Sequence, residues 1–169
     1  MSALPPHNLL GFRAAVSDDA TLLSSLAIRS KAHWGYSPEF MAAAVDELSV
    51  SATDIRRSDY HCVLAMLDST VAGFYVLENL AGDDVQLGSL FVDSEYIGTG
   101  IGRSLIDQAK SQAVGLGAKT LHIVSDPNAA DFYRAMGAIQ SGSKESGSIA
   151  GRFLPCFEMS LENMSAGIC

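Results

Sequence analysis

The sequence predicts a single-domain α/β protein with a mixed, mostly antiparallel central sheet. Residues 62–92 hold three apolar runs separated by polar turns, which is typical of an antiparallel meander. Strand 85–92, the helix after it and strand 120–124 then form one β-α-β crossover with parallel strands. The 169 residues suffice for one domain with a full core and are few for two. We therefore expect one domain over residues 1–169, with about 6–7 strands and about 4 flanking helices.

The first part of the chain predicts one strand and two helices. Residues 1–10 contain two prolines and little pattern, so we expect a loose lead-in. A short strand follows at 12–16. Ser17 precedes two acidic residues and an apolar helical face, which predicts a helix that ends near Ser30. Ser37, followed directly by proline, caps the second helix.

The rest of the chain is richer in strands, because short apolar runs alternate with turn residues. Helices are marked there by apolar residues at helical spacing and by glycines at their ends. The order of elements is strand, two helices, three strands, helix, strand, helix and two strands. The predicted elements after residue 60 are strands at 62–67, 71–77, 85–92, 120–124 and 152–161, helices at 101–113 and 128–136, and a loop at 142–151.

Composition and charge restrict the class of protein. Hydrophobic residues make up 48% of the chain and charged residues 18%, as in globular proteins. The net charge of −8 argues against a nucleic-acid partner, since phosphate neutralisation needs a basic face. No apolar run approaches the ~20 residues of a membrane span and no signal-peptide pattern is visible, so we expect a cytoplasmic protein without a membrane partner. Three cysteines at unrelated spacings, and His122 without a Cys or His partner, predict no metal site.

The glycine-rich turn after strand 85–92 predicts an anion site. Glycines alternate at Gly98, Gly100 and Gly102, and a helix begins there. Such glycines let the backbone approach a bound group, and a helix N-terminus directs free N–H groups at an anion. The spacing fits neither a Walker loop nor the dinucleotide fingerprint, in which glycine would stand at Arg103. The alternative is an ordinary tight turn between a strand and a helix.

This turn resembles the acyl-coenzyme A loop of the GNAT acetyltransferase superfamily, [Q/R]-x-x-G-x-[G/A], with Gly100 and Gly102 on the family's glycines. Ile97 departs from the family's usual Gln or Arg, which removes one polar contact. Residues 125–138 resemble a second family segment, N-x-x-A-x-x-F-Y-x-x-x-G-F, with a displaced alanine and with Ala138 in place of phenylalanine. The two motifs stand in the family's order, and the order of elements is similar across nearly the whole chain.

The resemblance implies an N-acetyltransferase that moves an acetyl group from acetyl-CoA to a primary amine of a small molecule or peptide, by direct attack in a ternary complex. It implies that strand 85–92 splays from its parallel neighbour near Phe91 and Val92, which frees backbone N–H groups. It also implies Tyr133 as the general acid, since a phenol of pKa ~10 can protonate a thiolate. The implied cofactor contacts are Phe91, Val92, Ile97, Gly98, Thr99, Gly100, Gly102, Arg103, Asn128 and Tyr133.

Several roles stay open. Tyr133 has the alternative role of a packing residue, and Asn128 that of a helix start. Relatives build the acceptor pocket from the segment between the first two helices and from the last hairpin. In this chain the aromatic residues of the first segment would either form an apolar or cation–π wall for an amine or anchor their loop to the core. That segment contains His33, Trp34 and Tyr36, and the hairpin covers residues 142–155. Strand 85–92 lacks an acid in its middle, so the general base is unassigned among Glu78, Asp83, Asp84, Asp93, Glu95 and His61.

Two other functions are compatible with the sequence. A non-catalytic acyl-CoA-binding or regulatory domain would suit Ile97 and the missing strand carboxylate, while Tyr133 argues against it. An enzyme that transfers a longer acyl group, or that acts on an oxygen acceptor, is the third hypothesis. Because many relatives are dimers, the resemblance also implies a homodimer.

Overall fold

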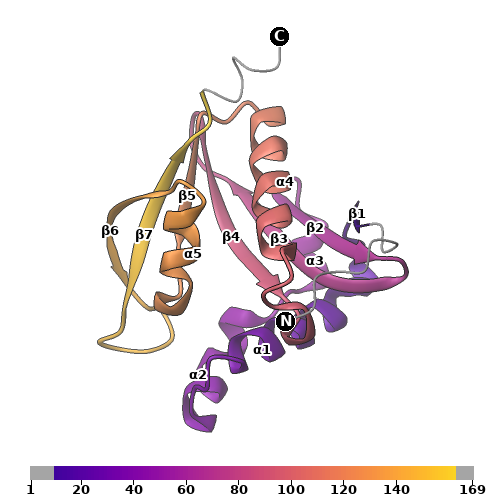
Figure 1. The fold of residues 1–169 in the computed structure, drawn as a ribbon, viewed down its shortest axis with the longest axis vertical. Helices are drawn as coiled ribbons and strands as arrows, with labels where there is room; N and C mark the ends of the chain where they lie inside the picture. Colours follow the sequence, from indigo (N-terminus) through magenta and orange to yellow (C-terminus); the bar gives the residue numbers. More distant parts are fainter. Residues whose placement is uncertain (1–9, 163–169) are drawn as a thin grey trace.

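A seven-stranded sheet forms the middle layer of the computed structural model, which describes residues 10–162 (Figure 1). The strand order is β1-β2-β3-β4-β5-β7-β6, and only β4 and β5 pair in parallel. This confirms the predicted mixed, mostly antiparallel sheet. The expected lead-in lies outside the described residues except for Leu10. The strands are β1 (Leu10–Ala14), β2 (Tyr60–Leu67), β3 (Thr70–Asn79), β4 (Asp84–Val92), β5 (Thr120–Val124), β6 (Ile139–Glu145) and β7 (Phe153–Ser160).

Helices cover both faces of the sheet. The four expected helices are α1 (Ala20–Ala32), α2 (Pro38–Leu48), α4 (Ile101–Gly115) and α5 (Ala130–Ala135), and a single-turn α3 (Ala52–Ile55) was not predicted. The first two pack over one face with side chains such as Phe74 and Val76, and the last two pack over the other with Tyr75 and Leu77. None of the helices within residues 10–162 combines the length and apolar character that a membrane span requires.

The start of α1 differs from the prediction. Ser17 does not cap the helix: residues 17–19 form a 3-10 turn and α1 begins at Ala20. Asp19 is the N-cap residue of α1, but its carboxylate makes no bond to the first turn of that helix. It turns back instead, accepting the N–H of Val16 at 2.8 Å and binding Arg13 at 2.9 Å. The cap of α2 is as predicted, because Ser37 Oγ accepts the N–H of Phe40 at 3.1 Å.

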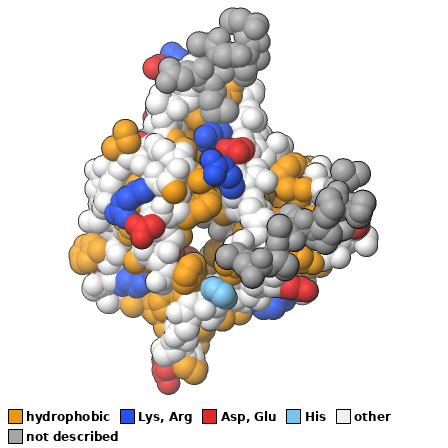
Figure 2. Space-filling view, viewed as in Figure 1, with side chains coloured by type: hydrophobic (Ala, Val, Ile, Leu, Met, Phe, Trp, Pro, Cys, Tyr) orange, Lys and Arg blue, Asp and Glu red, His pale blue; other side chains and the backbone are white. Residues whose placement is uncertain are grey.

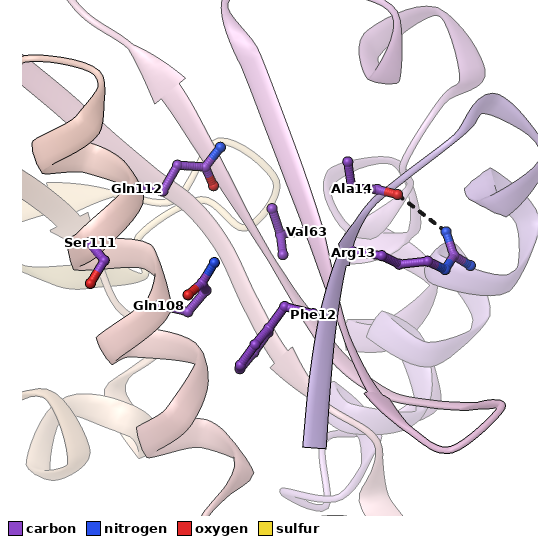
Figure 3. Close-up of a pocket in the computed structure, with 7 residues that line it drawn as sticks. All are labelled: Phe12, Arg13, Ala14, Val63, Gln108, Ser111 and Gln112. Atoms are coloured by element: carbon purple, nitrogen blue, oxygen red, sulfur yellow. Dashed lines mark hydrogen bonds between the residues drawn. The ribbon is translucent and has the colours of Figure 1, made fainter. Parts of the chain in front are cut away.

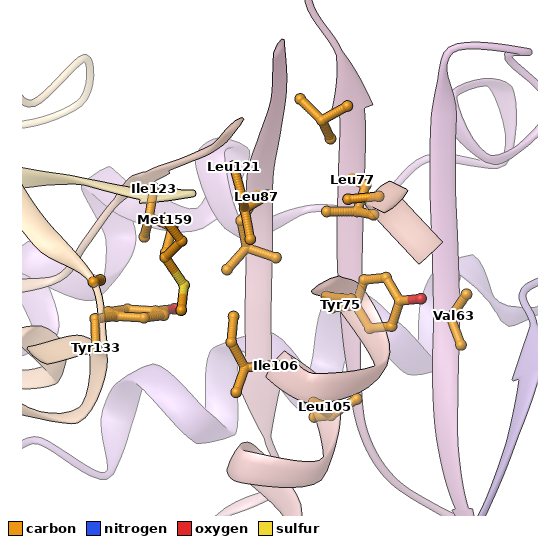
Figure 4. Close-up of a cluster of buried hydrophobic side chains, with 14 of the residues drawn as sticks. Val63, Tyr75, Leu77, Leu87, Leu105, Ile106, Leu121, Ile123, Tyr133 and Met159 are labelled. Atoms are coloured by element: carbon orange, nitrogen blue, oxygen red, sulfur yellow. The ribbon is translucent and has the colours of Figure 1, made fainter. Parts of the chain in front are cut away.

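The larger core lies under α4 and α5 and runs from Val63 on β2 to Tyr133 on α5 (Figure 4). Leu105 and Ile106 of α4 are fully buried in it. Burial of each such side chain stabilises the fold by about 1.5–3 kcal/mol. The helix that follows the glycine turn is therefore held firmly against β3 and β4.

The expected loop at 142–151 is partly wrong, because β6 continues to Glu145 and pairs with β7. Every residue of β6 is exposed. Its Ser, Gly and Lys residues show no alternation of buried and exposed side chains, so the pattern that reveals a half-buried strand is missing. Backbone pairing in the hairpin, rather than burial, defines this strand.

Candidate functional site

The two parallel strands β4 and β5 separate after a short paired segment. They pair only from Asp84 and Thr120 to Leu87 and Ile123. Gly88 is an extra residue at this point, since the β3–β4 register shifts there, and β4 continues beside β3 alone. In Figure 1 the two strands diverge downward, and Figure 2 shows a hollow between α5 and α4. The divergence predicted near Phe91 and Val92 is therefore present and begins earlier, at the bulge.

The glycine turn ends in a helix start with unused donors. Gly98 and Gly100 have φ angles of +83° and +94°, which other residues adopt at a cost. The N–H groups of Ile101, Gly102 and Arg103 have no acceptor within residues 10–162, and the first helical bond runs from Ser104 to the Gly100 carbonyl. Free N–H groups at a helix start, together with the helix dipole, are able to bind an anion.

Beside Gly100 the structure leaves room for such an anion. Apart from the adjacent residues 99 and 101, no atom of the described chain lies within 4 Å of the point where a Cβ on residue 100 would stand. A Cβ on residue 102 would instead touch the ring of Phe132 at 3.5 Å. Gly100 therefore supplies a backbone conformation and open space, whereas a Cβ at residue 102 would make only an ordinary van der Waals contact with Phe132 of α5.

An ion pair connects the glycine turn to α1. Arg29 donates to Asp93 from Nη2 at 2.8 Å and from Nε at 3.3 Å, and the Asp93 N–H bonds to the Ala72 carbonyl at 2.8 Å. The hydrogen bond from Arg29 lowers the pKa of Asp93 below its ordinary value. Asp93 is thus a structural carboxylate and a poor candidate for a base.

Tyr133 lies where the gap between β4 and β5 meets α5. Its side chain is only 6% exposed and packs against Phe132 and Phe157. Its hydroxyl has no hydrogen-bond partner among residues 10–162. Every fully buried polar side-chain atom in that range has a partner, so the Tyr133 hydroxyl is not fully buried and retains some solvent contact. Figure 4 shows it directed away from β6, toward β4 and α4. Burial first, and then the charge of Asp126, raises the pKa of Tyr133 above its ordinary value.

A polar network, here called the Tyr36 cluster, lies at the end of β5. It consists of Lys31, Tyr36, Asp126, Asn128 and Arg152. The Tyr36 hydroxyl donates to Asp126 Oδ2 at 2.8 Å and accepts from Asn128 Nδ2 and Arg152 Nη2, each at 2.9 Å. Asp126 also accepts from Lys31 Nζ at 2.6 Å and from Arg152 Nη2 at 3.2 Å. The network joins segments that lie more than 90 residues apart.

The environment of the Tyr36 cluster fixes its charge states. Burial alone would raise the pKa of Asp126, but hydrogen bonds from Lys31, from the Asn128 N–H and from Tyr36 hold that pKa below its ordinary value. Burial, followed by the hydrogen bond to Asp126, raises the pKa of Tyr36. At neutral pH Asp126 is thus ionised and the Tyr36 phenol is neutral.

The aromatic trio predicted for the acceptor pocket does not stay together. His33 and Trp34 are exposed and pack edge to face at 5.4 Å, whereas Tyr36 turns inward and stacks on Phe40 at 4.0 Å. Gly35, with φ +81°, reverses the chain between them. Asn128 gives its side-chain N–H to Tyr36 and lies in the middle of a short 3-10 turn that Asp126 caps. Lys31 and Asp126 were not predicted from the sequence, although an aspartate before proline at a strand end is a typical capping signal.

Of the six candidate bases, Glu78 alone reaches the bulge in β4. Its Oε1 atom lies 2.7 Å from the point that a Cβ on Gly88 would occupy. Arg57 Nη2 lies 3.5 Å from the other carboxylate oxygen. The remaining candidates are engaged or exposed elsewhere: Asp83 is near Lys119, Asp84 pairs with His122, Asp93 pairs with Arg29, His61 bonds to Asn79, and Glu95 is exposed in the turn.

A separate hollow of about 420 Å³ lies between β1 and the outer side of α4 (Figure 3). Phe12, Gln108, Ser111 and Gln112 line it, and Arg13 at its edge is already bound to Asp19. It contains neither the helix N-terminus nor Tyr133. The gap between β4 and β5 is therefore the better candidate site.

Comparisons with known proteins agree with this arrangement. No curated protein sequence matches the chain. Solved structures that match include the PaiA N-acetyltransferase of Thermoplasma acidophilum in complex with coenzyme A, at 22% identity and TM-score 0.76, covering 90% of this chain and 99% of that one. A GCN5-related N-acetyltransferase of Rhodopseudomonas palustris matches at 25% identity and TM-score 0.71, covering 89% and 94%. The ribosomal-protein-S18-alanine N-acetyltransferase of Escherichia coli matches at 16% identity and TM-score 0.67, covering 90% and 94%.

A family model described as "Acetyltransferase (GNAT) domain" matches residues 23–153. This range includes the glycine turn, Tyr133 and all the residues of the Tyr36 cluster. Because the match covers well over half of the chain, the protein belongs to the GNAT acetyltransferase family and is an acetyltransferase enzyme.

Proposed function

We propose that the protein transfers an acetyl group from acetyl-CoA to a primary amine of a small molecule or peptide, by direct attack in a ternary complex. One observation carries the proposal. The gap between β4 and β5 opens toward the end where the glycine turn follows β4 and the Tyr133 helix follows β5. The anion site and the proposed acid therefore flank a single gap.

The donor is proposed to lie along the exposed edge of β4. The N–H groups at the start of α4 bind its pyrophosphate, and Arg103, exposed on the first turn, adds positive charge in a chain of net charge −8. Beyond Leu87 the edge of β4 that faces β5 has no strand partner within residues 10–162, so its backbone groups are available to the pantetheine arm and the thioester. The proposed contacts remain those of the turn, the strand edge and α5: Phe91, Val92, Ile97, Gly98, Thr99, Gly100, Gly102, Arg103, Asn128 and Tyr133.

Two side chains are proposed to move protons. Glu78 accepts the proton of the acceptor amine, directly or through water, while the amine nitrogen forms a bond to the thioester carbon. The carbon–sulfur bond then breaks, and Tyr133 gives its proton to the departing thiolate. Burial raises the pKa of the Tyr133 phenol, and it would likewise raise the pKa of the coenzyme A thiol in the gap. The two pKa values therefore stay similar, and the proton transfer between the two groups costs little free energy. Solvent restores the proton of Tyr133.

The experiment begins with calorimetric titration of the purified protein with acetyl-CoA, free CoA and ATP. Release of free thiol is then followed against a panel of amines, with and without EDTA. We expect tight binding of acetyl-CoA, no binding of ATP, and thiol release that depends on an amine and is insensitive to EDTA. Binding without turnover of any amine would favour the non-catalytic acyl-CoA-binding alternative, and absence of acetyl-CoA binding would contradict the assignment of the glycine turn.

Assembly is proposed on the resemblance to the family, and location on the sequence pattern. We expect a homodimer, to be tested by light scattering on the purified protein. A cytoplasmic location is expected as well, and fractionation of cells that express the tagged protein would test it.

A further inference from the structure

We infer that the acceptor carries a carboxylate in addition to its amine, and that Lys31 and Arg152 of the Tyr36 cluster bind this carboxylate. The inference rests on the proposed function and specifies the substrate class. Its first support is charge. Within residues 10–162, Lys31 and Arg152 form ion pairs with a single carboxylate, that of Asp126. A cationic excess therefore lies beside the gap of a chain whose net charge is −8.

The second support is unused hydrogen-bonding capacity. Lys31 has three N–H donors and bonds to one acceptor, while Arg152 bonds only through Nη2, leaving Nη1 and Nε without an acceptor in the described chain. These two side chains are only 14% and 17% exposed. Asp126 already accepts from Lys31, Tyr36, Arg152 and the Asn128 N–H, so it has little further capacity. A second carboxylate is the partner that suits both an ammonium group and a guanidinium edge.

The third support concerns the aromatic rings, which would otherwise attract a cationic acceptor. The guanidinium of Arg152 lies 4.8 Å from the Phe40 ring centre and 5.4 Å from that of Tyr36. Lys31 Nζ lies 5.5 Å from the Tyr36 ring centre. The protein's own cations thus occupy these ring faces, so an acceptor with positive charge alone would meet repulsion here.

The position of the Tyr36 cluster suits an acceptor that reaches the gap from the α1–α2 side. Asp126 ends the β5 segment and caps the short turn that continues into α5 and Tyr133. Arg152 comes from the β6–β7 connection, which also contacts α2 through a 2.6 Å bond from Ser148 to Glu47. An acceptor whose carboxylate is held by Lys31 and Arg152 then directs its amine toward the gap.

The test compares acceptors that differ only in the carboxylate. The pairs are phenylalanine with phenethylamine and lysine with cadaverine, each measured as kcat/KM for thiol release. We expect the carboxylate-bearing member to be favoured by about 10-fold or more, the usual value of a charge-assisted pair of hydrogen bonds. Turnover that favours the decarboxylated amines would overturn this inference alone. Acetyl-CoA binding without turnover of any acceptor would overturn the proposed function together with it.

Variants separate substrate binding from a purely structural role. Arg152→Gln should raise KM for the carboxylate acceptor about 10-fold and leave kcat/KM for its decarboxylated partner within about 2-fold. Arg56→Gln, at an exposed arginine on the C-cap of α3, is the matched control and should change neither value. An equal loss of kcat/KM for both members of a pair would show that Arg152 has only a structural role in connecting segments of the fold. If Arg152→Gln does not fold, Lys31→Gln and the wild-type comparison decide the same question.

Discussion

The carboxylate of Glu78 on β3 lies over Gly88 on β4, at the residue where β4 leaves its parallel neighbour. Its Oε1 atom stands 2.7 Å from the point that a Cβ on residue 88 would occupy. Any larger residue at position 88 would displace this carboxylate. The bulge at Gly88 therefore performs two tasks, since it ends the pairing with β5 and admits an acid from the adjacent strand.

Glu78→Gln tests the proposed base. We expect kcat to fall by about 10²–10⁴-fold at neutral pH, the usual effect of removing a general base, with unchanged affinity for acetyl-CoA. The loss should shrink as the pH rises toward about 10, because a lysine-like amine then loses its proton without help. Steady-state kinetics between pH 7 and pH 10 would measure both effects, with the exposed Glu95→Gln as control. An unchanged kcat would remove Glu78 from the mechanism.

Gly88→Ala tests the same relationship from the other strand. The added methyl group meets Glu78 Oε1 at 2.7 Å, so the carboxylate must move and kcat should fall. Gly115→Ala is the matched control, because no described atom outside its own helix lies within 4 Å of the new Cβ there. That control should be neutral or slightly stabilising. Equal kcat values for the two variants would contradict a role for the Glu78 position.

Tyr133→Phe tests the proposed acid. The ring keeps its packing against Phe132 and Phe157, so the thermal midpoint should change little while kcat falls. Because burial raises the pKa of Tyr133, the wild-type phenol stays protonated up to and beyond its ordinary pKa of ~10, and loss of this proton should not limit kcat below that pH. A pH profile of both proteins provides the measurement. Full turnover by the variant would show that Tyr133 is a packing residue only.

Gly100→Val tests the glycine turn. Residue 100 has φ +94°, and its Cβ would enter the open space proposed for the donor's pyrophosphate. Gly117→Val is the matched control at the other end of the helix, with φ +88° and the same open surroundings. Both variants should lose about 1–2 kcal/mol of stability through backbone strain, but only the first should lose acetyl-CoA binding. Calorimetric titration of the folded variants distinguishes them, and unchanged affinity in Gly100→Val would place the donor elsewhere.

Asp93→Asn tests the link between the turn and α1. The folded-state pKa of Asp93 is lowered, so its ion pair with Arg29 stabilises the fold above the unfolded pKa of ~3.9 and is lost as pH falls through the folded value. Since Arg29 is half exposed, the variant should lose only about 0.5–1 kcal/mol at pH 7. Urea unfolding at several pH values would show a constant difference from wild type above about pH 4 and a difference that shrinks as the pH falls below that value. A difference that does not depend on pH would show that the charge of Asp93 is unimportant.

Much of the fold was predictable because its pattern is local. The apolar spacing of α4, the proline after Ser37 and the three apolar runs of the meander each identify an element without tertiary information. The displaced start of α1 and the fully exposed β6 were not predictable. In the first, residues 17–19 form a 3-10 turn in which Asp19 accepts the N–H of Val16, so the helix begins after it; in the second, no side chain is buried.

The candidate site was only partly predictable, because the fold assembles it from distant segments. The glycine turn is contiguous in sequence, so it was visible in the printed chain. The hydrogen bond between Tyr36 and Arg152 joins residues 116 positions apart in the sequence. The contact of Glu78 with Gly88 depends on a β-bulge that no sequence pattern predicts. Neighbours in sequence also separate, as when Gly35 directs Trp34 outward and Tyr36 inward.

The short pairing of β4 with β5 divides the sheet into two halves, β1–β4 and β5–β7–β6, which share only four residue pairs. A donor bound along the free edge of β4 would lie between β4 and β5 where these strands no longer pair, so the bound substrate would connect the two halves of the sheet. The Tyr36 cluster is a second connection between the halves, since Lys31 belongs to one and Arg152 to the other. Both substrates would then bind between the two halves of the sheet. Each would stabilise the relative position of the halves and so favour binding of the other.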